Sequence, residues 1–264
     1  MQPDRLSFRW LGVQGLELRC DGRTLAIDPF FTRPSPGFFL FRRVQPDHAL
    51  SRRHLERCDA ILVTHSHYDH VMDVPEIAVR TGATVYGSAN VGQILAISGI
   101  PAHQFHEIAP GEQLSLGPFV VEIFANHHVS LPIDPFINGP LKPSLQLPLR
   151  LLDYRMDRSF GFWIQAQGVR LLFCPGPARP ADLLFAGAWR SLSDFGSLLA
   201  ATRPRLFLPV HWDNFFRPLD APLRELVPPG GHSLSRLERF VHTASPTTKF
   251  CVPELLKWVC VDEL

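Results

Sequence analysis

One short segment of the chain holds four side chains that can bind a metal ion. Residues 65–70 read His-Ser-His-Tyr-Asp-His, and they directly follow Ala60–Thr64, which is apolar and rich in β-branched residues. Such a run is typical of a buried strand. A buried strand that ends in imidazole and carboxylate groups is a rigid platform for a metal site. We therefore expect a metal centre at the end of this strand rather than a solvated polar loop.

The spacing within this segment divides the four candidate ligands between two metal positions. His65 and His67 are two residues apart, so their side chains point the same way in an extended chain. Asp69 and His70 follow where the chain must turn, so they can face a second ion. Zinc, as one or two ions, is the expected metal, and manganese or iron would also suit these ligands.

The pattern His65-x-His67-x-Asp69-His70 resembles the signature of the metallo-β-lactamase-fold hydrolases, and the similarity runs from about Phe8 to Leu219. This resemblance implies an αββα sandwich, in which two mixed sheets pack face to face with helices outside. We expect one such domain over residues 1–264. The segment 209–219 resembles the branch that includes the ascorbate-phosphate lactonase. Residues 30–43 are loosely similar to N-acylphosphatidylethanolamine-hydrolysing phospholipase D.

The resemblance also implies the remaining metal ligands. His128 follows the predicted strand Phe119–Ala125 and would complete the first site, with His127 as the alternative. His211 follows the predicted strand 205–210 and would complete the second site. The first metal would then be bound by His65, His67 and His128, and the second by Asp69, His70 and His211.

Three aspartates are candidates for supporting or catalytic roles. Asp28 ends the predicted strand Arg23–Ile27, where the resembling family has an aspartate that braces the metal-binding loop; a strand-terminating Asp-Pro turn is the alternative. Asp69 would hold the second metal and orient the nucleophile. Asp213 would support His211, approach the metal or transfer a proton, with a turn cap as the alternative.

The chain departs from the family pattern at one position. The fourth family motif is typically Gly-Asp, whose aspartate bridges two metals, but here the chain reads Cys174-Pro175-Gly176-Pro177. We interpret Cys174 as a buried structural thiol. Without a bridging carboxylate, the second metal should bind more weakly. A non-catalytic metal-binding or ligand-binding relative is therefore one alternative function.

Two apolar loops are candidates for contact with a substrate. Residues 30–43 contain five phenylalanines followed by two arginines, so Phe38–Phe41 could insert into a membrane surface, or the loop could fold over the core. A lipid phosphodiesterase is the corresponding alternative function. Residues 131–157 are rich in proline and leucine, and we expect them to form a lid or a substrate wall beside the metal.

Composition excludes several classes of protein. The net charge of +1 provides no field that would attract nucleic acid. Five cysteines without a Cys-x-x-Cys pair argue against a disulfide framework and favour a cytoplasmic location. No apolar run approaches the ~20 residues of a transmembrane helix, and no signal peptide is visible. The expected partner is a small-molecule or lipid substrate, and a homo-oligomer is an open alternative.

These features together predict a metal-dependent hydrolase. Its substrate would be an ester, a lactone or a phosphodiester, attacked by a water molecule that the metal activates.

Overall fold

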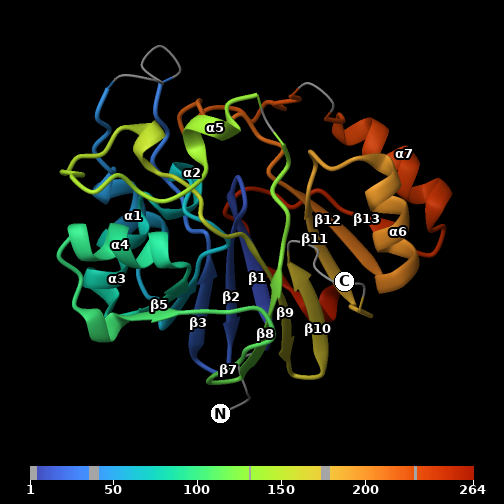
Figure 1. Ribbon diagram of the computed structural model, residues 1–264. Coiled ribbons are helices and arrows are strands. Elements are labelled where there is room, and N and C mark those ends of the chain that lie inside the picture. Colours follow the sequence, from blue (N-terminus) through green and yellow to red (C-terminus); the bar gives the residue numbers. More distant parts are fainter. Residues whose placement is uncertain (1–4, 36–41, 131, 174–178, 229–230) are drawn as a thin grey trace.

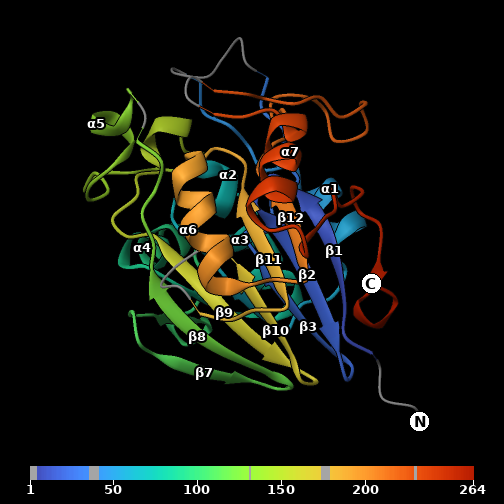
Figure 2. The same ribbon diagram turned by 90° about the vertical axis from the view of Figure 1, so that its right-hand side faces the viewer.

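Two mixed sheets packed face to face form the centre of the molecule (Figure 1). The structure is a computed structural model that describes residues 5–35, 42–130, 132–173, 179–228 and 231–264. Helices α1 (His48–His54), α3 (Val74–Thr81) and α4 (Ala89–Ile97) cover the outer face of one sheet. Helices α6 (Leu192–Thr202) and α7 (Leu234–Ala244) cover the other sheet, as Figure 2 shows. The predicted αββα sandwich is confirmed.

The first sheet has the strand order β14-β1-β2-β3-β4-β5-β6. Its strands begin with two antiparallel hairpins, and β3, β4, β5 and β6 then run parallel to one another. The strand bounds are β1 (Ser7–Gly12), β2 (Gly15–Cys20), β3 (Arg23–Ile27), β4 (Ala60–Leu62), β5 (Thr84–Gly87), β6 (Phe105–Glu107) and β14 (Val259–Cys260).

The second sheet repeats this plan in the order β13-β12-β11-β10-β9-β8-β7. Strands β7 to β10 are antiparallel, and β10, β11, β12 and β13 are parallel. The strand bounds are β7 (Gln113–Leu116), β8 (Phe119–Ala125), β9 (Phe160–Ala166), β10 (Val169–Phe173), β11 (Leu183–Gly187), β12 (Leu206–Val210) and β13 (Lys249–Phe250). Two similar halves therefore face each other, although the sequence has no visible repeat.

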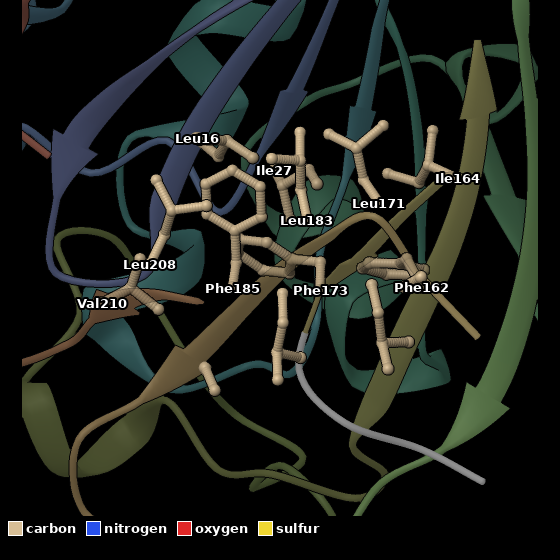
Figure 3. Packing of buried hydrophobic residues seen from close by; sticks show 14 of the residues in the cluster. Leu16, Ile27, Phe162, Ile164, Leu171, Phe173, Leu183, Phe185, Leu208 and Val210 are labelled. Carbon is tan, nitrogen blue, oxygen red and sulfur yellow. The ribbon is translucent and has the colours of Figure 1, made fainter. Parts of the chain in front are cut away.

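Apolar side chains from both sheets meet in a shared core (Figure 3). Leu16 and Ile27 of the first sheet face Phe173 and Phe185 of the second. The rings of Phe8 and Phe185 meet edge to face with centroids 5.2 Å apart, and so join β1 to β11. A second apolar cluster fills the space between the first sheet and its helices. This packing fixes the positions of the strand ends, where the predicted site lies.

Several elements were not predicted. Helix α1 begins after Asp47, whose side chain accepts hydrogen bonds from two backbone N–H groups in the first turn. Eight further elements were also missed. They are the short helices α2 (Tyr68–Val71) and α5 (Asp134–Ile137), the 3-10 turns η2 (Ala102–Gln104), η3 (Leu151–Asp153) and η4 (Val261–Glu263), and strands β11, β13 and β14. These elements are short, so tertiary pairing rather than local periodicity defines them.

The C-terminal tail, which suggested no interpretation from sequence, closes the first sheet. Its strand β14 pairs with β1, and the Trp258 ring lies against the guanidinium groups of Arg9 and Arg19. In the described ranges, no helix is both long and apolar enough to cross a membrane.

We predict that Phe185→Ala lowers the free energy of unfolding by about 3–5 kcal/mol, because it opens a cavity between the two sheets. Urea denaturation followed by circular dichroism measures this change. Val120→Ala is the matched control, since Val120 is 42% exposed on β8 and should cost less than about 1 kcal/mol. Equal losses in both variants would contradict the role given to this core.

Candidate metal centre

The ends of three strands bring the predicted ligands to one edge of the sandwich. Strand β4 leads into His65 and His67, and α2 follows at once with Asp69 and His70. His67 is the residue that precedes the first turn of α2, so the chain turns from extended to helical within the motif. His128 follows β8, and His211 follows β12 directly. Because each side chain follows a buried strand, its backbone is held by the core.

The six side chains form two groups of three. The first group is His65, His67 and His128, and the second group is Asp69, His70 and His211. Within each group, one possible ligand atom from each residue lies within 4.8 Å of the others. The two groups are adjacent, because the rings of His65 and His70 have centroids 3.8 Å apart. The grouping is the one that the motif spacing and the resemblance predict.

The structure distinguishes the two histidines at the end of β8. His128 belongs to the first group and is partly buried, with its ring centroid 4.8 Å from that of His67. His127 is exposed and belongs to neither group. The arrangement therefore favours His128 as the third ligand.

Hydrogen bonds fix the tautomers of two histidines in the first group. The Thr64 hydroxyl donates to Asp28, so it accepts from Nδ1 of His65 at 3.0 Å, which leaves a lone pair on Nε2. Nε2 of His67 lies 3.2 Å from the carbonyl oxygen of Ile137 and donates to it, which leaves a lone pair on Nδ1. These two lone-pair nitrogens lie 3.1 Å apart. Two acceptors cannot bond each other, so this geometry fits a cation bound by both.

The second group has the spacing of ligands around one ion. Nδ1 of His70 donates to Asp28 at 2.7 Å, so its Nε2 is the free acceptor. Asp69 Oδ2 lies 3.5 Å from that nitrogen and 3.3 Å from Nε2 of His211. A tetrahedral zinc with bonds of about 2.0–2.1 Å would space its ligands by about 3.3–3.4 Å. The donors present therefore fit a zinc-sized cation.

The protonation states of the first group and of Asp69 also suit metal binding. Burial lowers the pKa of His67 and of His128 to about 4, and burial together with the neighbouring histidines holds the pKa of His65 well below its usual range. Burial alone would raise the pKa of Asp69, but His70 and His211 lower it well below its usual range. The first group is therefore neutral and Asp69 is ionised at pH 7, which are the forms that bind metal.

Asp28 contacts both groups. It lies at the end of β3, directly beside β4, and its backbone N–H donates to the carbonyl oxygen of Leu62 at 3.0 Å. Its carboxylate accepts from the Thr64 hydroxyl, which orients His65, and from His70. Its φ is +44°, a region that non-glycine residues rarely adopt. The contacts favour the bracing role over a simple strand-terminating turn.

Asp213 lies outside both groups of candidate ligands. Its carboxylate accepts from the backbone N–H of Val13 at 2.8 Å and lies 3.4 Å from a guanidinium nitrogen of Arg33. The carbonyl oxygen of Val13 in turn accepts from the backbone N–H of His211 at 2.7 Å. Asp213 thus positions His211 through the turn that joins β1 to β2. These contacts support a positioning role and give no support to the predicted proton transfer.

The long segment predicted as a lid, residues 131–157, also contacts the candidate ligand His67. Asn138, directly after α5, lies with its side-chain oxygen 3.3 Å from Nε2 of His67, close to the Ile137 carbonyl. Ser66 and Asn90 donate to the carbonyl oxygen of Arg155, which anchors the far end of the segment beside the motif. Shortening this segment would therefore disturb metal binding as well as a substrate wall, contrary to a lid acting on the substrate alone.

Two sequence predictions fall on parts of the chain that the structure does not describe. Phe38–Phe41, the proposed membrane contact, lie outside the described residues. So do Cys174-Pro175-Gly176-Pro177, where the family has its bridging aspartate.

A cavity of about 70 Å³ opens beside the ligands and is lined by His65, His128 and His211 together with Trp189 and Arg190. Trp189 and Arg190 follow β11, and the Trp189 ring lies 4.7 Å from that of His211. Sequence reasoning missed both residues because it did not assign β11. The apolar run Leu183–Gly187, which ends just before them, was the available signal.

The fold and the two ligand groups define a protein of the metallo-β-lactamase fold. The family model described as a beta-lactamase superfamily domain matches residues 23–212. The chain belongs to this superfamily.

Relatives and solved structures agree with this assignment. A UPF0173 metal-dependent hydrolase from Cupriavidus taiwanensis is 27% identical over 223 residues, which cover 78% of this chain and 73% of that protein. Igni18, a metallo hydrolase from Ignicoccus hospitalis, has a similar fold with a TM-score of 0.65 at 17% identity, over 97% of this chain and 98% of that one. CmlA, a diiron β-hydroxylase from Streptomyces venezuelae, has a TM-score of 0.62 at 16% identity, over 98% of this chain and 55% of that one.

We predict that Asp28→Asn weakens metal binding by about 10- to 100-fold, because one carboxylate orients a histidine in each group. Metal content after dialysis against a mild chelator, measured by elemental analysis, tests this. Asp182→Asn is the control, since Asp182 pairs with Arg170 away from the site. Retention of metal equal to that of the wild type would contradict the role given to Asp28.

We predict that Asp213→Asn lowers the free energy of unfolding by about 3 kcal/mol, because Arg33, which is 4% exposed, loses its ion-pair partner. Chemical denaturation measures the change. Any fall in metal content should come only from the second group, because His211 is then positioned less firmly. Unchanged stability with complete loss of hydrolysis would instead restore the catalytic role.

Proposed function

We propose that the protein is a metal-dependent hydrolase that uses a metal-activated water to cleave an ester, a lactone or a phosphodiester. The observation that carries the proposal is the pair of adjacent ligand groups at the strand ends, with two acceptor nitrogens of the first group, on His65 and His67, facing one another. The relatives named metal-dependent hydrolases and the superfamily membership support it.

The chain's own residues would divide the work as follows. His65, His67 and His128 would bind one ion, and Asp69, His70 and His211 a second. When bound, the ions would supply Lewis acidity and lower the pKa of a water molecule. Asp69 would orient that water, because its carboxylate is ionised and lies beside the second group's His211, 3.3 Å from Nε2. Asp28 and Thr64 would hold His65 and His70 in their ligating tautomers.

The metal is proposed to be zinc, with manganese and iron as the alternatives to measure. Nitrogen and carboxylate ligands accept all three ions. One fold neighbour is a diiron enzyme, so elemental analysis should cover iron as well as zinc. The second ion should bind more weakly than the first, since the sequence carries no carboxylate at positions 174–178 to bridge the two.

The substrates proposed for testing follow from the finer resemblances. The segment after β12 is similar to the branch of the ascorbate-phosphate lactonase. This resemblance makes lactones and phosphate esters the first substrates to test. A lipid phosphodiesterase rests on Phe38–Phe41, and liposome co-sedimentation that disappears on Phe38→Asp and Phe39→Asp substitution would test it. We propose a small-molecule substrate as the first choice, because the described part of the cavity is small.

The test is hydrolysis of a panel of lactones, phosphodiesters and simple esters by the metal-loaded protein and by His67→Ala. We expect turnover of at least one class by the wild type. The variant should lose metal from the first group and at least 100-fold in rate, since one of three ligands is removed. Turnover by the metal-free protein or by His67→Ala that equals turnover by the metal-loaded wild type would contradict the proposal. His103→Ala, an exposed histidine far from the motif in sequence, is the matched control.

A further inference from the structure

We propose that Arg190 binds an oxyanion of the substrate, so that the preferred substrates are anionic: phosphate esters, or esters and lactones that carry a carboxylate. This inference rests on the proposed function, because it names the substrate class of the same site. Arg190 lies three residues after the end of β11. It lines the cavity that His65, His128 and His211 also line.

Arg190 is held in place without being neutralised. Its Nη2 donates to the side-chain oxygen of Asn126 at 2.7 Å. Asn126 is fixed in turn, because its backbone N–H donates to the carbonyl oxygen of Ser159 at 2.9 Å. Among the described side chains, no carboxylate forms an ion pair with Arg190. The guanidinium group is thus oriented by a neutral partner and keeps its full charge and further N–H donors.

The described lining of the cavity holds no carboxylate that would compensate this charge. The side chains that line its described part include Gln14, Asn126, Ser159 and histidines, but neither an aspartate nor a glutamate. Among the six candidate metal ligands, only Asp69 is a carboxylate. Two bound divalent cations would therefore carry more positive charge than the two carboxylates of Asp69 and Asp28 neutralise. An anionic substrate would relieve this excess, whereas a neutral one would not.

A second donor lies in the same wall. Nε1 of Trp189 is buried and has no hydrogen-bond partner among the described residues, although a buried N–H normally has one. The Trp189 ring packs against His211 and Phe215, so it cannot swing freely to find water. An oxyanion held by Arg190 would offer this indole N–H an acceptor. An arginine and an adjacent N–H donor together suit phosphate or carboxylate oxygens.

The binding experiment uses the metal-loaded full chain and calorimetry with inorganic phosphate and, separately, acetate. We expect Arg190→Gln to weaken anion binding by about 10- to 100-fold, because a charged hydrogen bond is lost. Metal content should stay unchanged. Arg190→Lys should recover only part of the affinity, because lysine keeps the charge but lacks the planar fork. Arg239→Gln, on the exposed face of α7, is the control and should stay within about twofold of the wild type.

The comparison of the two anions assigns the oxyanion to phosphate or to carboxylate, and either result supports the proposal. Equal affinity of the wild type and Arg190→Gln for both anions would overturn it, as would no binding of either anion by the wild type. A fall in metal content together with the loss of anion binding would also overturn it, because Arg190 would then only hold Asn126 and the strand end that carries His128.

Kinetics provide an independent test. For an anionic phosphodiester, Arg190→Gln should raise KM by about 10-fold or more, and for a neutral ester KM should stay within about twofold. An equal effect on both substrates would overturn the proposal. If the wild type turns over neither substrate, the proposed hydrolase function fails, whereas the calorimetry still decides whether Arg190 binds anions.

Discussion

The site depends on one buried carboxylate. Asp28 ends β3 beside the end of β4, and its two oxygens accept from Thr64 and from His70. Through Thr64 it orients His65, so a single side chain sets one histidine in each ligand group. The parallel pairing of β3 with β4 fixes this relation, because the register places Ile27 opposite Leu62 and hence Asp28 against the start of the motif. The fold therefore prepares the tautomers before any ion binds.

The other supports follow the same principle, in which backbone groups at strand ends hold the ligands. The turn at Val13 connects Asp213 to the backbone of His211, and the carbonyl oxygen of Ile137 accepts a hydrogen bond from His67. Asp69 is the one carboxylate among the six candidate ligands, and the other five are histidines. Arg190, which has no carboxylate partner among the described residues, lines the cavity beside these candidate ligands. The proposed preference for anionic substrates rests on this arrangement of charge.

The features that could be predicted from the sequence are those that depend on neighbouring residues in the chain. The motif at residues 65–70 indicated the ligands, and the alternation of strands and helices together with the family resemblance indicated the sandwich. Supports that connect distant segments could not be predicted, since nothing local shows that Asp213 bonds Val13 or that Asn138 meets His67. Arg190 was missed for the same reason: β11 is only five residues long, and its pairing with β10 and β12 defines it.

The most direct test of the central claim is a crystal structure of the metal-loaded protein with anomalous difference maps at the zinc and iron absorption edges. We predict two peaks, one among His65, His67 and His128 and a weaker one among Asp69, His70 and His211. Peaks at these positions would show that the two groups are the metal sites. The absence of any peak there, in protein whose metal content has been verified, would contradict the account.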